Sequence, residues 1–209
     1  MNPKHAALIV TDIQNDFCPG GALAVNEGNK IIPVVNEFIH LFYRVVATQD
    51  WHPIDHISFA SSHRGKKPFD SIDINGYQQT LWPDHCVQGT KGADFHPDLN
   101  TRPFSCIIHK GTHPNIDSYS TFIENDGKTT TGLDGYLKSL GIKEVFLCGL
   151  ATDFCVLYSA LDAAGLGYKT FVILDACKGI DVPAGSIDAA IARMKQHGVV
   201  ITASGELKK

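Results

Sequence analysis

Cys155 lies where an apolar strand pattern gives way to a helical one, and this position favours a reactive thiol. Residues 145–150 form an apolar run typical of a central parallel strand, and Gly149 allows a tight turn. Thr152 can then cap a helix whose first turn carries Cys155. The free N–H groups and the dipole at a helix N-terminus stabilise a thiolate and can hold an oxyanion. We therefore expect a thiol whose pKa lies below its ordinary value.

Charged residues end three other predicted strands, namely Asp12, Asp50 and Lys110. In open α/β sheets ligands bind outside the carboxyl ends of the strands, so Asp12, Lys110 and Cys155 are expected to converge. A carboxylate beside a thiol can take its proton and later pass that proton to a leaving amine. A neighbouring ammonium keeps the carboxylate ionised. The set predicts acyl transfer by a cysteine nucleophile that needs no histidine base.

A second group of residues has the character of metal ligands. Asp50 and His52 are two residues apart at an extended strand end, so their side chains point to the same side. His85 can supply another ligand from a long loop, and His56 is a weaker candidate for a fourth. Carboxylate plus imidazole suits one divalent ion, with Zn²⁺ the first expectation and Fe²⁺ or Mn²⁺ as alternatives.

Strand-like and helical patterns alternate along the chain and would position these residues. The apolar, mostly β-branched runs are 6–12, 45–50, 106–110, 145–150, 170–175 and 199–202. Helical patterns span about 29–43, 133–140, 153–164 and 186–197, and Thr131, Asp134 and Gly141 mark the two ends of the second. This order predicts a three-layer α/β fold, with a mostly parallel six-stranded sheet and helices on both faces.

Residues 51–104 interrupt this alternation, because the segment is far longer than the usual connection of about 2–6 residues. It is rich in Pro, Gly, His and Asp, yet its aromatic residues, such as Trp51 and Trp82, argue against disorder. We expect a single domain over residues 1–209 in which 51–104 forms a metal- and substrate-binding loop region.

Composition excludes several classes of protein. The 209 residues are 44% hydrophobic, which suits a globular chain with a sizeable core. The formal net charge of −4 lacks the basic footprint of a nucleic-acid-binding protein. The apolar run 6–10 is too short for a signal peptide or a membrane span, so we expect a cytoplasmic protein with reduced cysteines. No CxxC pair occurs, which disfavours a cysteine zinc site.

Together these motifs resemble those of the nicotinamidases, cysteine amidases of the isochorismatase-like hydrolase superfamily. The resemblance runs through nearly the whole chain, in the segments DIQNDFCPGG (12–21), TQDWHP (48–53), LWPDHC (81–86), GTKGADFH (89–96), HKG (109–111) and GLATDFCV (149–156). It implies hydrolysis of nicotinamide to nicotinate and ammonia in NAD salvage, through a cysteine thioester, with pyrazinamide as a further substrate.

The resemblance also implies a role for each catalytic residue. Cys155 would be the nucleophile, Asp12 the acid and base, and Lys110 their electrostatic partner. The backbone N–H groups of Ala151 and Cys155 would form the oxyanion hole, next to a cis peptide bond between Leu150 and Ala151.

The binding residues follow from the same resemblance. The metal would be held by Asp50, His52 and His85, with His56 left open as a further ligand. Phe17 and Trp82 would flank the pyridine ring, and Tyr119 would lie near the pocket.

Three other interpretations stay open. A sibling amidase would act on another carboxamide or on a ureido substrate, although the metal ligands count against it. In a metallohydrolase the metal would activate water and Cys155 would be structural. A nucleotide-binding module is disfavoured, because no G-x-G-x-x-G or Walker lysine is present. The sequence also leaves open whether the chain forms a homo-oligomer.

Overall fold

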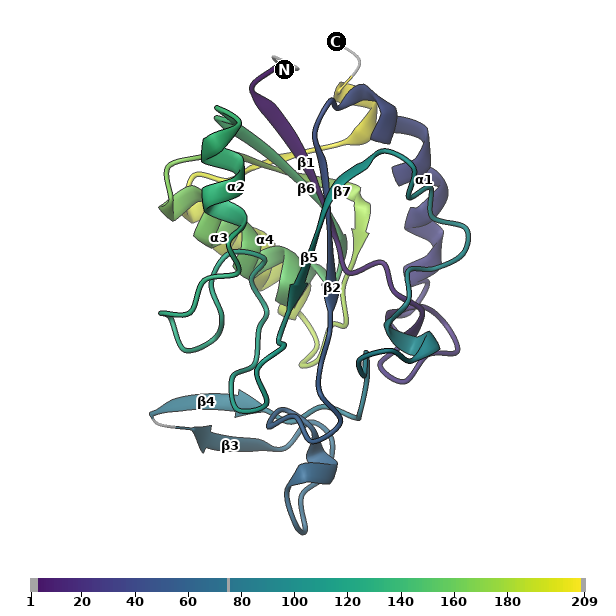
Figure 1. Cartoon of the computed structure of the whole chain (residues 1–209), viewed down its shortest axis with the longest axis vertical. Helices are drawn as coiled ribbons and strands as arrows, with labels where there is room; N and C mark the ends of the chain where they lie inside the picture. Colours follow the sequence, from purple (N-terminus) through teal and green to yellow (C-terminus); the bar gives the residue numbers. More distant parts are fainter. Residues whose placement is uncertain (1–3, 75, 208–209) are drawn as a thin grey trace.

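The computed structural model describes residues 4–74 and 76–207, which form a six-stranded sheet with helices on both faces (Figure 1). Its strands are β1 (Ala6–Thr11), β2 (Val45–Asp50), β5 (Phe104–Lys110), β6 (Glu144–Leu150), β7 (Lys169–Lys178) and β8 (Val200–Thr202). They lie in the order β5-β2-β1-β6-β7-β8, and every neighbouring pair is parallel. The predicted fold class is confirmed.

Four α-helices in the described part of the chain connect these strands: α1 (Ile31–Phe38), α2 (Leu133–Ser139), α3 (Leu157–Gly165) and α4 (Ser186–Gln196). Figure 1 shows α1 on one face of the sheet and α2, α3 and α4 on the other. Right-handed crossovers require this split, because the connection through α1 crosses the sheet in the opposite direction from those through α2, α3 and α4. None of the described helices has the length and apolar character needed to span a bilayer.

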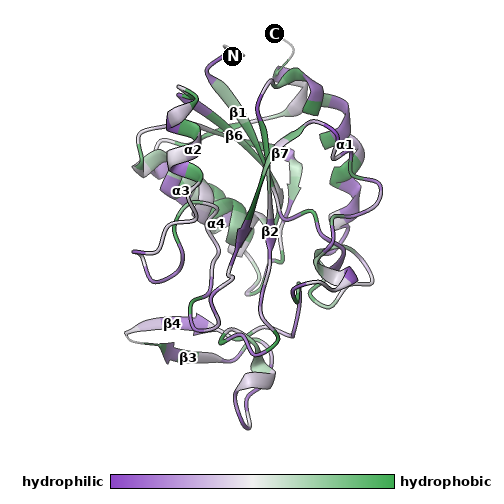
Figure 2. Cartoon of the chain, viewed as in Figure 1, coloured by the Kyte–Doolittle hydropathy of each residue, from purple (hydrophilic) through white to green (hydrophobic). Residues whose placement is uncertain are grey.

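The central strands are apolar on both faces because helices cover both. Every residue of β1 and β2 is buried, as are residues 145–150 of β6, and Figure 2 shows the hydrophobic colour concentrated there. Burying one large aliphatic side chain contributes about 1.5–3 kcal/mol. The strand ends are therefore held by a well-packed core, which gives the residues that follow them fixed positions.

Strand order changes direction at β1, whose neighbours β2 and β6 lead to opposite edges of the sheet. In such sheets the carboxyl ends of the strands form a ligand-binding crevice at the switch. Asp12 follows β1, Asp50 ends β2, Lys110 ends β5, and Cys155 comes shortly after β6. The topology thus brings together residues that lie far apart in the sequence.

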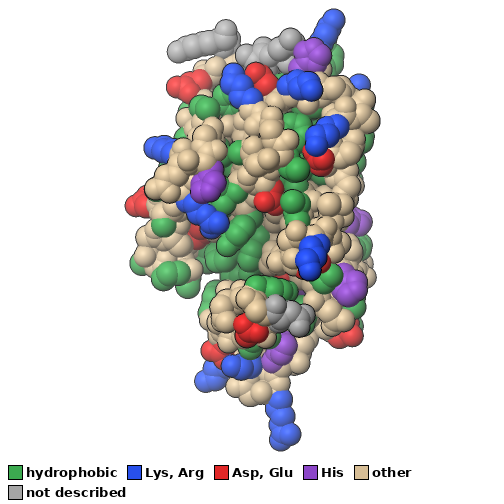
Figure 3. Space-filling view, turned by 90° about the vertical axis from the view of Figure 1, so that its left-hand side faces the viewer, with side chains coloured by type: hydrophobic (Ala, Val, Ile, Leu, Met, Phe, Trp, Pro, Cys, Tyr) green, Lys and Arg blue, Asp and Glu red, His purple; other side chains and the backbone are tan. Residues whose placement is uncertain are grey.

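The long connection from β2 to β5 contains an antiparallel hairpin that the sequence pattern did not predict, β3 (Ser71–Ile74) with β4 (Tyr77–Thr80). β3 alternates polar and apolar residues over only four positions, and β4 has no aliphatic residue, so neither carries a strong strand signal. The hairpin projects below the body of the molecule in Figure 1. In the view of Figure 3, hydrophobic side chains gather where the hairpin meets the body.

Two predicted helix caps are wrong, although α2 begins at Leu133 as predicted. The sequence predicts Thr152 as an N-cap, but Thr152 lies inside a π-helical turn (Thr152–Val156) that precedes α3, and Ala151 occupies the cap position. In the same way Gly132, with a φ of 89°, precedes α2. The hydroxyl of Thr131 still accepts a hydrogen bond from the Leu133 amide at 3.3 Å. Thr131 and Thr152 both lie near a helix start, but the residues at the cap positions are Gly132 and Ala151.

Candidate active site

Side chains from four strand ends meet in one buried cluster. The Nζ of Lys110 lies 2.9 Å from Oδ2 of Asp12 and 3.5 Å from Sγ of Cys155. It also forms an ion pair with Asp50 and donates a hydrogen bond to the carbonyl of Ser118 at 3.1 Å. The sequence predicts that Asp12, Lys110 and Cys155 converge, and the structure brings them together. Asp50 joins them, so one ammonium links the thiol to the predicted metal ligand.

Two carboxylates hold Lys110 in its charged form. Burial alone would lower the pKa of Lys110, but Asp12 and Asp50 outweigh burial and raise this pKa well above its ordinary value. Burial would likewise raise the pKa of Asp50, yet Lys110 and His52 hold it well below its usual range. The Lys110–Asp50 ion pair therefore stays charged at neutral pH.

The pKa of the Cys155 thiol is raised well above its ordinary value, so the predicted lowering is wrong. Burial is the largest cause, Lys110 opposes it, and Asp12 and Asp50 raise the pKa further. Burial also raises the pKa of Asp12, against the opposite effect of Lys110. The helix terminus does not prevail because the sulfur lies out of water near two carboxylates. The resting sulfur is a neutral thiol, and its activation requires a base.

Thr48 fixes the orientation of Asp12. Its hydroxyl donates a hydrogen bond of 2.6 Å to Oδ1 of Asp12, while Oδ2 faces Lys110. Asp12 itself has a φ of 50°, in a region that is uncommon for residues other than glycine. The sequence reasoning missed Thr48, although a signal was present. Thr48 and Asp50 are two residues apart on one strand, so both point toward the same face.

In the turn that carries Cys155, the amides on either side of this residue donate to the same carbonyl. The carbonyl of Ala151 accepts hydrogen bonds from the amides of Phe154 and Val156, both at 3.1 Å, which are the residues on either side of Cys155. The peptide bond between Leu150 and Ala151 is cis, as the resemblance implies.

Two contacts hold this turn in place. A Cβ added at Gly149 would lie 2.0 Å from the carbonyl oxygen of Thr11, so only glycine permits this approach between β6 and β1. The carboxylate of Asp153 accepts hydrogen bonds from the amides of Ile180 and Asp181, both at 2.9 Å. The turn is thereby tied to the loop that follows β7.

A small pocket opens beside Cys155. Its apolar walls are contributed by Phe17, Leu23, Trp82, Tyr119, Phe154 and Ile180, and its polar lining by Asp50, His85, Asp117 and Ser118. The mixture of flat apolar walls and a few polar groups is typical of a small-molecule site. Phe17, Trp82 and Tyr119, which the resemblance implies as substrate contacts, all line this pocket.

Aromatic contacts set the planes of these walls. The indole N–H of Trp82 donates to the hydroxyl of Tyr119 at 3.3 Å, and the Trp82 ring meets Phe154 edge-on at 4.9 Å between centroids. Phe17 packs edge-on against His85 at 5.4 Å. The walls are thus supported by one another and by a predicted metal ligand.

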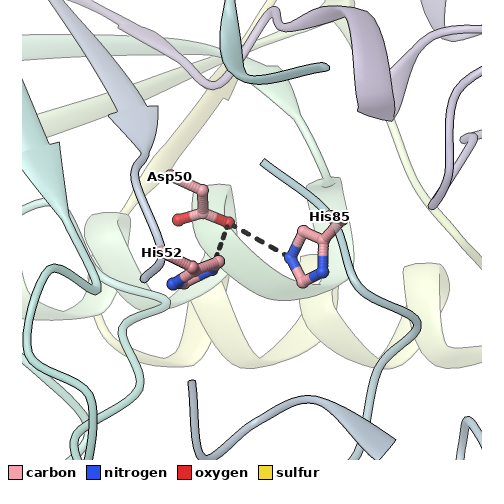
Figure 4. A group of neighbouring side chains, drawn as sticks. All are labelled: Asp50, His52 and His85. Atoms are coloured by element: carbon pink, nitrogen blue, oxygen red, sulfur yellow. Dashed lines mark ion pairs between the residues drawn. The ribbon is translucent and has the colours of Figure 1, made fainter. Parts of the chain in front are cut away.

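Asp50, His52 and His85 form the predicted ligand group (Figure 4). The Nε2 atoms of the two histidines lie 3.6 and 3.7 Å from Oδ2 of Asp50, beyond the length of a good hydrogen bond. The Nδ1 atoms lie 2.9 Å from the carbonyl of Gly111 and 2.8 Å from that of Pro83, so each must donate. This leaves Nε2 of each ring directed at the carboxylate, and in the neutral ring Nε2 carries the lone pair that a metal ligand requires. These residues fit a divalent ion.

His56 lies behind His52 and does not face this group. Its Nε2 is 3.1 Å from the carbonyl of Ile116, and its Nδ1 is 2.7 Å from the hydroxyl of Ser58. Burial lowers the pKa of His56 to about 4, so the ring is neutral. Ligand atoms of His52, His56 and Asp117 also lie within 4.8 Å of one another. Since both nitrogens of His56 are engaged, its contact with the ligand group is the stacking of its ring on His52, at 4.2 Å.

Comparisons with known proteins agree over almost the full chain. Residues 6–206 match the family model described as the isochorismatase domain. The nicotinamidase of Acinetobacter baylyi is 53% identical over 94% of this chain and 91% of its own length. The nicotinamidase of Escherichia coli is 44% identical, covering 93% of each chain.

Solved structures show the same likeness. An Acinetobacter baumanii nicotinamidase/pyrazinamidase superposes with a TM-score of 0.97 at 54% identity, covering 99% of this chain and 100% of the other. A protein of L. infantum, solved in complex with nicotinate, gives a TM-score of 0.85 at 37% identity, covering 98% and 96%. The pyrazinamidase of Pyrococcus horikoshii, solved in complex with zinc, gives 0.78 at 42% identity, covering 95% and 99%.

Proposed function

Because this chain belongs to the isochorismatase family and resembles nicotinamidases over nearly its whole length, we propose that it hydrolyses nicotinamide to nicotinate and ammonia. The observation that carries this conclusion is the composition of one pocket. Cys155 lines it together with two of the three candidate metal ligands, Asp50 and His85. A nucleophile for a carboxamide and ligands for a ring-binding metal therefore face the same small cavity.

The catalytic steps follow from the positions of Asp12 and Cys155. Asp12 takes the thiol proton, and the thiolate attacks the carboxamide carbon. The N–H groups of Ala151 and Cys155 donate to the oxyanion that forms. Asp12 then returns the proton to the departing ammonia, which leaves a thioester. A water molecule that gives its proton to Asp12 hydrolyses the thioester, releasing nicotinate and restoring the thiol.

Lys110 and Thr48 prepare Asp12 for these steps. The ammonium of Lys110 opposes the effect of burial and favours the ionised form of Asp12. It also lowers the pKa of the Cys155 thiol, against the larger effect of burial. Thr48 holds the carboxylate in one orientation. The proton can then move over a short and fixed path, and little rearrangement is needed during turnover.

The remaining pocket residues recognise the substrate. Phe17 and Trp82 provide flat walls for the pyridine ring, and Tyr119 supports Trp82. Asp50, His52 and His85 would hold a divalent ion, for which zinc is our first proposal because a similar pyrazinamidase was solved with zinc. When bound, the ion supplies an open coordination position that can accept the nitrogen of the ring. Pyrazinamide, which has a ring nitrogen in the same place, is expected to be a substrate as well.

The other interpretations have less support. A structural cysteine has no need of an ammonium at 3.5 Å or of a neighbouring carboxylate, which disfavours the metallohydrolase. We also propose a cytoplasmic location, which is supported by the six cysteines, since each is a free thiol in the described residues.

The test is turnover by the purified protein. Incubation with nicotinamide should release nicotinate and ammonia in equal amounts, and a ureido compound of similar size should not react. Turnover of the ureido compound without turnover of nicotinamide would assign the chain to a sibling amidase.

A further inference from the structure

Gln14 lies just past the end of β1, at a point where β2 extends beyond its pairing with β1. The parallel register between these strands ends at Val10 and Ala47, whereas β2 extends to Asp50. The main chain turns away after Thr11, so it cannot supply backbone partners to the last residues of β2 on this side. Another group has to satisfy them, because buried backbone N–H and C=O groups are almost always paired.

The side-chain amide of Gln14 supplies these partners. Its Nε2 donates to the carbonyl of Asp50 at 2.8 Å, and its Oε1 accepts from the amide of Asp50 at 2.9 Å. This pair of bonds imitates the exchange of two hydrogen bonds between opposed residues of antiparallel strands. Gln14 is fully buried, and its Nε2 also donates to the carbonyl of Ala93 at 2.8 Å.

The other edge of Asp50 is held by β5. Asp50 is in register with Lys110, and the amide of Trp51 donates to the carbonyl of Lys110 at 3.0 Å. The backbone of Asp50 is therefore clamped from both sides, by a strand and by the Gln14 amide. A clamp matters here because the Asp50 carboxylate has two tasks. One oxygen faces His52 and His85, and the other pairs with Lys110.

We propose that Gln14 is a positioning residue that sets the backbone of Asp50, and through it the geometry of the metal-ligand group. This inference rests on the metal site of the proposed function and adds a residue that touches neither metal nor substrate. Loss of a partner that orients a ligand typically lowers metal affinity by about 10–100-fold.

The test compares Gln14→Met with Gln49→Met. Methionine has nearly the length of glutamine but no amide. Gln49 is a matched control, because its Nε2 donates to the same carbonyl of Ala93 at 2.7 Å while its Oε1 contacts His109. Both substitutions remove a buried amide that donates to the Ala93 carbonyl, and only Gln14→Met removes the bonds to the Asp50 backbone. Gln14→Glu keeps an acceptor for the Asp50 amide and loses the donor.

Two measurements are made on each variant: hydrogen–deuterium exchange of the Asp50 amide in metal-free protein, and the Kd for Zn²⁺ by competition with a chelator. In Gln14→Met the Asp50 amide should exchange faster, and the Kd should rise about tenfold or more. In Gln49→Met the exchange should match wild type, and the Kd should stay within about threefold of it. Gln14→Glu keeps the acceptor, so exchange of the Asp50 amide should stay slow in this variant. If Gln14→Met does not fold, the same two measurements are made on Gln14→Glu.

Three results would overturn the inference. These are an unchanged Kd and exchange rate in Gln14→Met, equal losses in Gln49→Met, or a wild type that binds no metal. Neither measurement uses substrate, so the result is separate from the proposed activity. If the Kd values and exchange rates follow the expected pattern but wild type does not hydrolyse nicotinamide, the proposed function is refuted and the role of Gln14 is still supported.

Discussion

The hydroxyl of Thr48 donates a hydrogen bond of 2.6 Å to Oδ1 of Asp12, and both side chains are fully buried. Since the second oxygen of Asp12 faces Lys110, the carboxylate is held on both sides. In the proposed mechanism Asp12 takes and returns a proton in each half of the reaction. Its orientation toward Cys155 is therefore a condition of turnover, and Thr48 is one of the two groups that secure it.

Thr48→Val should lower kcat about tenfold with little change in KM, because it removes one hydrogen bond to the base and keeps the shape of the side chain. Thr11→Val is the matched control. The hydroxyl of Thr11 is also buried, next to Asp12, but has no hydrogen-bond partner among the described residues. Steady-state kinetics on both variants check this prediction. Equal kinetics in wild type and Thr48→Val would show that Asp12 does not depend on Thr48.

Cys155→Ala should abolish turnover while leaving the fold and the metal content intact, because covalent catalysis needs the sulfur. Asp12→Asn should be nearly as damaging, since an amide cannot carry the proton. Ammonia release, circular dichroism and elemental analysis on both variants provide the check. Activity above about 1% of wild type in Cys155→Ala would favour metal-activated water as the nucleophile.

Lys110→Met should move the alkylation of Cys155 by iodoacetamide to higher pH. Burial raises the pKa of the Cys155 thiol and Lys110 lowers it, so removal of the ammonium leaves a still higher pKa and less thiolate at a given pH. The rate is followed by mass spectrometry of the peptide that contains Cys155. Lys169→Met, at an exposed ion pair with Glu144, is the control and should leave the profile unchanged. An unshifted profile in Lys110→Met contradicts the proposed ion network.

The positions of the chemical groups were predictable because strand ends are readable in the sequence. Asp12, Asp50 and Lys110 each end or follow an apolar run, and a parallel sheet brings such ends together. Two properties were not predictable. The pKa of Cys155 depends on burial and on neighbours contributed by three other strands, and no local pattern reports these. The task of Gln14 depends on where β1 stops pairing with β2, which is a property of the register.

His56→Gln should retain bound metal, whereas His85→Ala should lose it. Both nitrogens of His56 are engaged by Ser58 and Ile116, while Nε2 of His85 faces Asp50. Elemental analysis after gentle purification distinguishes the two variants. Loss of metal from His56→Gln at the level of His85→Ala would make His56 a ligand.

His56 should also contribute to the pH dependence of stability in metal-free protein. Burial lowers its pKa from 6.5 to about 4, so between these values the unfolded chain binds more protons at this residue than the folded one. Stability therefore falls as pH decreases from 6.5 toward 4. Urea unfolding at several pH values should show a shallower decrease for His56→Gln than for wild type. Identical slopes would mean that folding does not lower the pKa of His56.

The most direct measurement compares nicotinamide with benzamide as substrates of the metal-loaded enzyme. Flat walls such as Phe17 and Trp82 distinguish pyridine from benzene poorly, whereas a coordination position that accepts the ring nitrogen is left to water by benzamide. The expected kcat/KM for benzamide is lower by roughly 100-fold or more, equivalent to about 2.7 kcal/mol. His85→Ala, which lacks a ligand, should lose most of this discrimination. Equal hydrolysis of the two amides by loaded wild type would contradict recognition of the ring nitrogen, and with it the physical basis for nicotinamide as the substrate.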